Sequence, residues 1–142
     1  MRASSISAAR DGAEPLLRRL RWNRALCLSC LASVAFLIYR DLSLPHVGAV
    51  EVWFGFEVRG AWARWTAPLH WALFAVAAAG FATDGRWVWR AAPWYLVYVA
   101  ISHLIWNWTS PSGGGTQAGL WQLALFLGAG AGLWRLARFV GR

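Results

Sequence analysis

No charged side chain interrupts residues 91–134, which read AAPWYLVYVAISHLIWNWTSPSGGGTQAGLWQLALFLGAGAGLW. A helix crosses the hydrocarbon core of a membrane in roughly 20 residues, so this stretch is too long for one span. Pro111 and the glycines at 113–115 interrupt it and predict a turn. The stretch therefore predicts two apolar helices, at about residues 87–108 and 117–137.

Two further apolar segments precede this stretch. They cover about residues 22–39 and 65–83, and arginines stand at their borders. The chain is 58% hydrophobic, with a mean hydropathy of +0.41, which is high for a soluble domain. We therefore predict an all-α integral membrane protein: a four-helix transmembrane bundle, with a long apolar external loop between its first and second helices.

The distribution of arginine predicts the orientation of this bundle. The net charge is +8 and all 14 basic residues are Arg, placed beside apolar segments rather than along a polar face. This placement argues against a nucleic-acid partner and for membrane topology. An inside N-terminus puts all but Arg40, Arg59 and Arg64 on the cytoplasmic side. Both termini are then cytoplasmic, and the absence of Lys favours a GC-rich bacterial source and its inner membrane.

The two ends of the first apolar segment carry separate predictions. Residues 1–21 read as an Arg-containing cytoplasmic tail in which Pro15 breaks any long helix, and residues 22–142 as one transmembrane domain. A basic segment followed by an apolar run also fits a secretory signal peptide. The nearest small-residue cleavage site, Val47-Gly48-Ala49, lies well beyond Tyr39 and disfavours cleavage.

Polar side chains inside the spans indicate where a site lies, because burying them in lipid is costly. His70 and His103 fall at matching depths near the outer ends of two antiparallel helices, so we expect them to face one another. Thr66 and Asn107 each lie one turn further out on the same helix face. Gln122 enters at a similar depth and His46 lies in the external loop. These six residues predict a polar pocket open to the outer leaflet.

Imidazole suits several ligands, and the sequence leaves them open. His70 and His103 are candidate axial ligands of haem b or ligands of a transition metal, and either is a candidate acid or base for a lipid or quinone headgroup. A metal would require a further ligand such as His46, Glu51 or Glu57 from the external loop. The two glutamates are otherwise read as solvated charges at the membrane interface. The same polar groups also suit a purely structural role, as hydrogen bonds between helices.

Two smaller patterns suggest contacts with metals or partners. Cys27 and Cys30 share a helix face, which fits a soft-metal or redox pair but also ordinary packing. Small residues recur every four positions in the last helix and suit close helix packing, either within the bundle or with a homo-oligomeric or membrane-complex partner. They are Ala124, Gly128 and Gly132.

The leading functional prediction is a small polytopic membrane protein whose outer pocket binds a cofactor or small ligand, as a possible subunit of a membrane complex. One alternative is an accessory protein without chemistry, and another is an enzyme or carrier acting on a lipid-like substrate. The sequence does not decide whether the protein is an enzyme.

Overall fold

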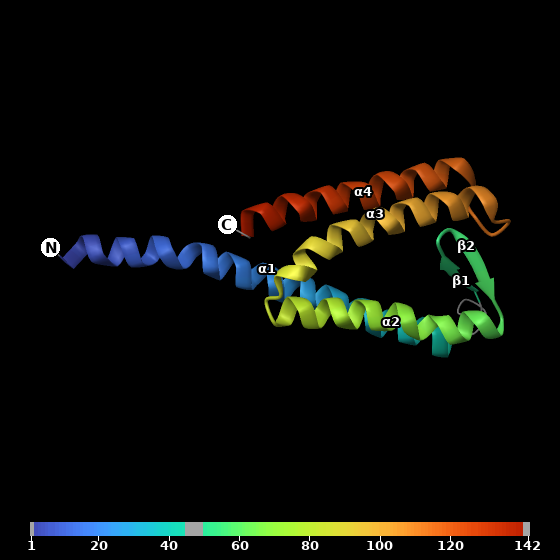
Figure 1. Cartoon of the computed structure of the whole chain (residues 1–142), viewed down its shortest axis with the longest axis horizontal. Helices are drawn as coiled ribbons and strands as arrows, with labels where there is room; N and C mark the ends of the chain where they lie inside the picture. The colour runs from blue at the N-terminus through green and yellow to red at the C-terminus, as the bar shows by residue number, and fades with distance from the viewer. Residues whose placement is uncertain (1, 45–49, 141–142) are drawn as a thin grey trace.

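The computed structural model describes residues 2–44 and 50–140. It contains four helices and one two-stranded antiparallel sheet, which falls between the first two helices in the sequence and lies at one end of the bundle (Figure 1). In chain order the elements are α1 (Arg2–Ser43), β1 (Val50–Trp53), β2 (Phe56–Arg59), α2 (Ala61–Ala82), α3 (Arg86–Thr109) and α4 (Gly115–Val140).

The helices confirm the predicted helical bundle. Within the described residues, three segments are long and apolar enough to cross a membrane: Leu16–Ser43, Ala61–Ala82 and Gly115–Phe139. Helix α3 has 24 residues, which is sufficient length for a span. Its Trp, Tyr, His and Asn side chains lower its hydropathy, and it is not among the three.

Helix α1 differs from the predicted tail, because it runs without a break from Arg2 to Ser43. Pro15 lies within it. A proline lacks an N–H group and so removes one hydrogen bond from the helix. The helix nevertheless continues through Pro15, and its N-terminal part projects beyond the other helices (Figure 1).

The helices associate as two antiparallel pairs. Helix α1 packs mainly on α2 and α3 mainly on α4, whereas α2 and α3 share few contacts. The pairs meet at the turn between α2 and α3 and separate toward the β-hairpin (Figure 1). The N-terminal half of α1 and the C-terminal end of α4 lie at the closed end, and the β-hairpin lies at the open end, which we call the hairpin end.

The hydrophobic core lies at the closed end, where the two pairs meet. Phe81, Val88 and Trp89 are its buried members. Trp89 Nε1 donates a hydrogen bond to Asn23 Oδ1 at 3.0 Å, and Asn23 Nδ2 donates to Asp84 Oδ1 at 2.6 Å. Because Asn23 belongs to α1 and Asp84 to the α2–α3 turn, this network holds three helices together.

The segment predicted as an external loop is the main correction to the all-α fold, because it contains a β-hairpin. Val50 pairs with Arg59 and Trp53 with Phe56, so only Phe54 and Gly55 form the turn. Both have positive φ, 53° and 86°, as a two-residue type I′ turn requires. The alternation of apolar residues with Glu51 and Glu57 therefore reflects strand pairing as well as contact with a surface.

The tip of the hairpin docks on α3. The backbone N–H of Gly55 donates to Ser102 Oγ at 2.8 Å, and that of Phe54 donates to Tyr98 Oη at 3.2 Å. A Cβ atom at Gly55 would lie 2.4 Å from Ile105 Cβ, so only glycine fits this approach. The hairpin therefore connects the α1–α2 pair to α3 across the open end.

In α4, the glycines that approach another helix are not those of the predicted stripe. A Cβ at Gly119 would lie 3.1 Å from Asn107, and one at Gly130 would lie 3.4 Å from Leu96, so both face α3. Gly128 and Gly132 are exposed and have open space around them, and Ala124 is exposed as well. The stripe therefore lies outside the internal packing, and its contact with a partner stays a prediction.

Candidate functional site

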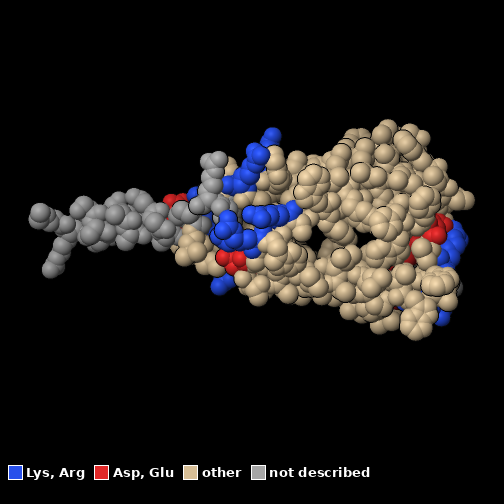
Figure 2. Space-filling model, viewed as in Figure 1, with Lys and Arg blue, Asp and Glu red and all other residues tan. Residues whose placement is uncertain are grey.

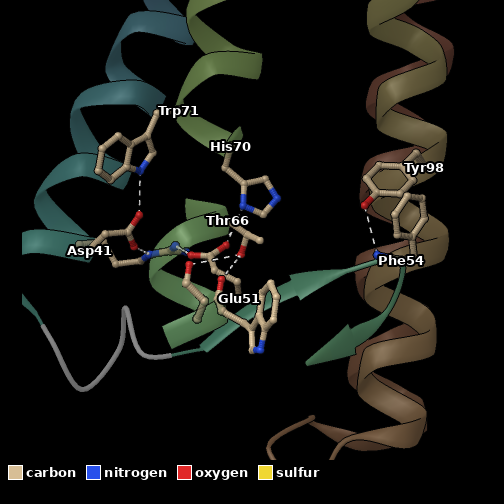
Figure 3. Close-up of polar contacts among 10 residues, drawn as sticks. Asp41, Glu51, Phe54, Thr66, His70, Trp71 and Tyr98 are labelled. Atoms are coloured by element: carbon tan, nitrogen blue, oxygen red, sulfur yellow. Dashed lines mark hydrogen bonds and ion pairs between the residues drawn. The ribbon is translucent and has the colours of Figure 1, made fainter. Parts of the chain in front are cut away.

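Glu51 is the centre of the site, because it is a charged residue on β1 that is only 2% exposed. Its Oε2 lies 2.6 Å from His70 Nδ1, and its Oε1 forms an ion pair with Arg40 (Figure 3). A buried carboxylate is tolerated only when it is paired and hydrogen-bonded. Glu51 is therefore not a solvated interface charge, because its carboxylate is buried and reaches His70 of α2.

A second carboxylate extends the cluster. Asp41, at the end of α1, lies 2.6 Å from Arg40 Nε and accepts a hydrogen bond of 2.7 Å from Trp71 Nε1 of α2. Arg40 thus lies between two buried carboxylates. Arg40 and the two carboxylates together carry one excess negative charge. We call these four residues, Arg40, Asp41, Glu51 and His70, the charge cluster.

The two ring nitrogens of His70 have different surroundings: Nδ1 lies against Glu51, and Nε2 points away from it. An ionised carboxylate only accepts hydrogen bonds, so Nδ1 donates to Glu51. The indole of Trp53 stacks on the imidazole, with ring centroids 4.1 Å apart and an interplanar angle of 9°. The other nitrogen, Nε2, points toward the side where α3 and Tyr98 lie (Figure 3). This tautomer leaves the Nε2 lone pair able to accept a proton or a hydrogen bond.

Aromatic rings border the region between α2 and α3, on the side of His70 that faces the closed end of the bundle. Phe74 lies one turn along α2 and contacts Tyr95 of α3 edge-on, at 5.9 Å between centroids. Tyr95 contacts Tyr98, and Tyr98 contacts Phe54 of the hairpin at 5.3 Å. In the space-filling view the surface is hollowed between the two helix pairs (Figure 2). The imidazole therefore stands at the edge of an aromatic region rather than in a sealed core.

The other predicted residues on α3 and α4 form a separate group. Asn107 Nδ2 donates to the carbonyl of His103 at 2.8 Å and to Gln122 Oε1 at 3.0 Å, and Asn107 Oδ1 accepts from the N–H of Gly114. The His103 ring packs against Phe126 at 5.2 Å and Trp106 at 6.0 Å. Its Nδ1 is buried and has no partner among the described residues. The structure thus brings Asn107 and Gln122 together at the contact between α3 and α4.

The described contacts of His70 and His103 differ. His70 is held by Glu51 and Trp53, whereas His103 packs toward α4. No group of three or more His, Cys, Asp or Glu side chains suited to a metal occurs within the described residues. His46 lies outside those residues, and the Thr66 hydroxyl bonds only to carbonyls of its own helix. Ligation of haem or of a metal by His70 and His103 therefore stays a prediction.

Glu57 anchors the other strand of the hairpin to the α3–α4 pair. Its Oε1 accepts a hydrogen bond from Trp106 Nε1 at 3.0 Å and another from Ser110 Oγ, while Arg59 binds its Oε2 at 2.8 Å through Nε. These hydrogen bonds, that of Ser110 foremost, lower the pKa of Glu57 from 4.5 to about 2. Glu57 is thus an ionised structural anchor.

Cys27 and Cys30 lie in α1, and both pack against the Phe81–Val88–Trp89 core as free thiols. This placement agrees with the packing interpretation.

Comparison with known proteins adds no assignment to this geometry. No family model, characterised protein or solved structure matches the chain. Its function must therefore be argued from the site itself.

Proposed function

We propose that this chain is a multi-pass protein of the bacterial inner membrane that binds a small amphipathic ligand at the hairpin end. The observation that carries the proposal is the Glu51–His70 pair, whose free imidazole nitrogen faces an aromatic region between two helix pairs. Small-molecule sites are mostly apolar, with a few fixed polar groups that orient the ligand. A ligand with an apolar body and a hydrogen-bonding head, such as a quinone or another lipid-like molecule, matches this arrangement.

The membrane part of the proposal rests on segment length and charge. Three helices suit membrane spans, and α3 has the length of a fourth. With α1 entering from the cytoplasm, the closed end with its arginines is cytoplasmic and the hairpin end is external. The ligand site then lies near the outer leaflet, as the sequence predicts, but is centred on Glu51 and His70 rather than on two histidines.

The binding proposal is tested with decylubiquinone added to the detergent-purified protein, with quenching of Trp fluorescence as the readout. We expect saturable quenching that becomes roughly tenfold or more weaker in His70→Gln, because a lost hydrogen bond to a partly buried polar group costs on the order of 1–3 kcal/mol. Arg64→Gln, an exposed change at the same end of α2, is the matched control and should bind normally. Circular dichroism checks that both variants are folded.

The structural alternative predicts a different result. If the charge cluster only holds the hairpin in place, the wild-type protein shows no saturable quenching, while His70→Gln still lowers thermal stability. Equal affinity in wild type and His70→Gln would place any quinone site elsewhere. Either result contradicts ligand binding at His70 and favours an accessory role, with partner contacts through a surface such as Ala124, Gly128 and Gly132.

A further inference from the structure

The closed end of the bundle carries most of the positive charge of the described chain. The arginines gather there around the meeting point of the two helix pairs (Figure 2). They come from three helices: Arg18, Arg19, Arg21 and Arg24 of α1, Arg86 and Arg90 of α3, and Arg135 and Arg138 of α4. We call this set the arginine cluster.

Few carboxylates balance the arginine cluster. Arg19 pairs with Asp84 at 2.7 Å, and Arg18 pairs with Glu14 at 3.2 Å on the exposed surface of α1. Asp84 Oδ1 also accepts a hydrogen bond from Asn23 Nδ2, so this carboxylate is already engaged by both Arg19 and Asn23. The other six arginines have no carboxylate partner among the side chains that the structure describes. An uncompensated group of this size attracts anions.

The spacing of these arginines suits a phosphate. Arg86 and Arg90 lie one turn apart on the first turns of α3, and Arg135 and Arg138 lie three residues apart near the end of α4. Guanidinium groups bind phosphate oxygens in a bidentate manner. The N-terminus of α3 adds to the positive potential, because Gly85 provides no side-chain cap and no acidic residue occurs in the first turn.

The surroundings of the arginines identify the source of the phosphate. Exposed apolar side chains stand beside them on the same helices, including Leu20, Trp22, Trp87 and Trp134. Arg138 lies over the Trp134 ring, 3.6 Å from its centroid. A soluble phosphate offers nothing to cover these apolar groups. A phospholipid offers a phosphate to the arginines and acyl chains to the apolar helix surfaces.

We infer that the arginine cluster binds the headgroups of anionic phospholipids and that this binding holds the two helix pairs together at the closed end. The inference does not depend on ligand binding at His70, which lies at the other end of α2. It also specifies a lipid class, which a general preference of arginine for the cytoplasmic side does not.

The test uses the full chain in detergent, titrated with phosphatidylglycerol or with phosphatidylcholine of the same acyl chains. Native mass spectrometry counts the bound lipids, and thermal unfolding reports their effect on stability. We expect phosphatidylglycerol to be retained and to raise Tm, with retention weakened by added salt. The double variant R86Q/R90Q should lose roughly tenfold or more in affinity, as expected from the contribution of single basic residues to anionic surfaces.

Two further variants separate charge from folding. R86K/R90K keeps the charge and should retain most of the binding, and Arg64→Gln, at the hairpin end, should behave as wild type. Equal retention of the two lipids would overturn the inference. So would unchanged retention in R86Q/R90Q, or equally tight binding of glycerol 3-phosphate, which would identify a site for a free phosphate.

Discussion

At the scale of single residues, the two glutamates of the hairpin have the same sequence context but different roles. Glu51 is buried beside Arg40 and His70, whereas Glu57 binds Trp106 and Ser110 at the surface. The sequence indicated that both lie in an apolar loop, and it left open whether they reach the bundle. Strand alternation and register decide this, because they determine which helix each side chain meets.

The hydrogen bonds of Glu57 predict an acid dependence of stability. Its pKa is about 2 in the folded chain and 4.5 without these contacts, so the folded state binds the proton less readily. The stabilisation is complete above pH 4.5 and is lost as the pH falls through about 2. Tm measured from about pH 6 to about pH 2 should therefore converge for wild type and Glu57→Gln. A difference in Tm that stays constant over this range contradicts the assignment.

At the scale of elements, hydropathy predicted the three later helices well, with bounds that followed charges and the Pro-Gly turn, whereas α1 continues through the predicted tail to Arg2. The predicted contact between His70 and His103 rests on matching depth and stays a prediction. Matching depth along two antiparallel helices fixes only the position along each axis, whereas contact also requires the right rotation about it. The structure shows Glu51 of β1 as a partner of His70, in the segment predicted as a long apolar loop.

The docking of the hairpin on α3 predicts a specific sensitivity at its turn. Gly55→Ala adds a methyl group 2.4 Å from Ile105 Cβ at a φ of 86°, so we expect a loss of stability of about 1–3 kcal/mol. Gly60→Ala is the matched control, because Gly60 also has a positive φ, 62°, but open space around it. Denaturant unfolding should show a larger loss for Gly55→Ala. Equal losses would mean that backbone strain alone acts and that the tip is not tightly docked.

At the scale of the whole molecule, the structure consists of two helix pairs joined at one end by a core and bridged at the other by the hairpin. Composition predicted the apolar bundle and the border arginines. It did not predict two separated pairs, because a residue count cannot distinguish four helices around one core from two packed pairs. The Ala124, Gly128 and Gly132 stripe illustrates this limit: its spacing suits close packing, but Gly130 makes the contact with α3 instead.

The proposed membrane orientation predicts which surfaces are accessible from each side. Ser112, in the turn between α3 and α4, and Arg18, on α1, lie at opposite ends of the bundle and are both exposed. In a variant with Cys27→Ala and Cys30→Ala, Ser112→Cys should react with a membrane-impermeant maleimide in intact spheroplasts. Arg18→Cys should react only after permeabilisation. The reverse pattern would invert the topology, and full labelling of both sites in intact spheroplasts would argue against membrane insertion.

The hairpin also has a consequence for biogenesis. Among the described residues, the side-chain partners of Glu51 are Arg40 and His70, which belong to the first half of the chain, so its charge can be paired as soon as α2 has been synthesised. The partners of Glu57 and of the hairpin tip, such as Trp106 and Ser102, are made later. The contacts of β1 with α1 and α2 can therefore form before those of β2 and the tip with α3. In the proposed membrane topology, local contacts would come first and distant ones second, an order that limits misassembly of a chain that enters a membrane one segment at a time.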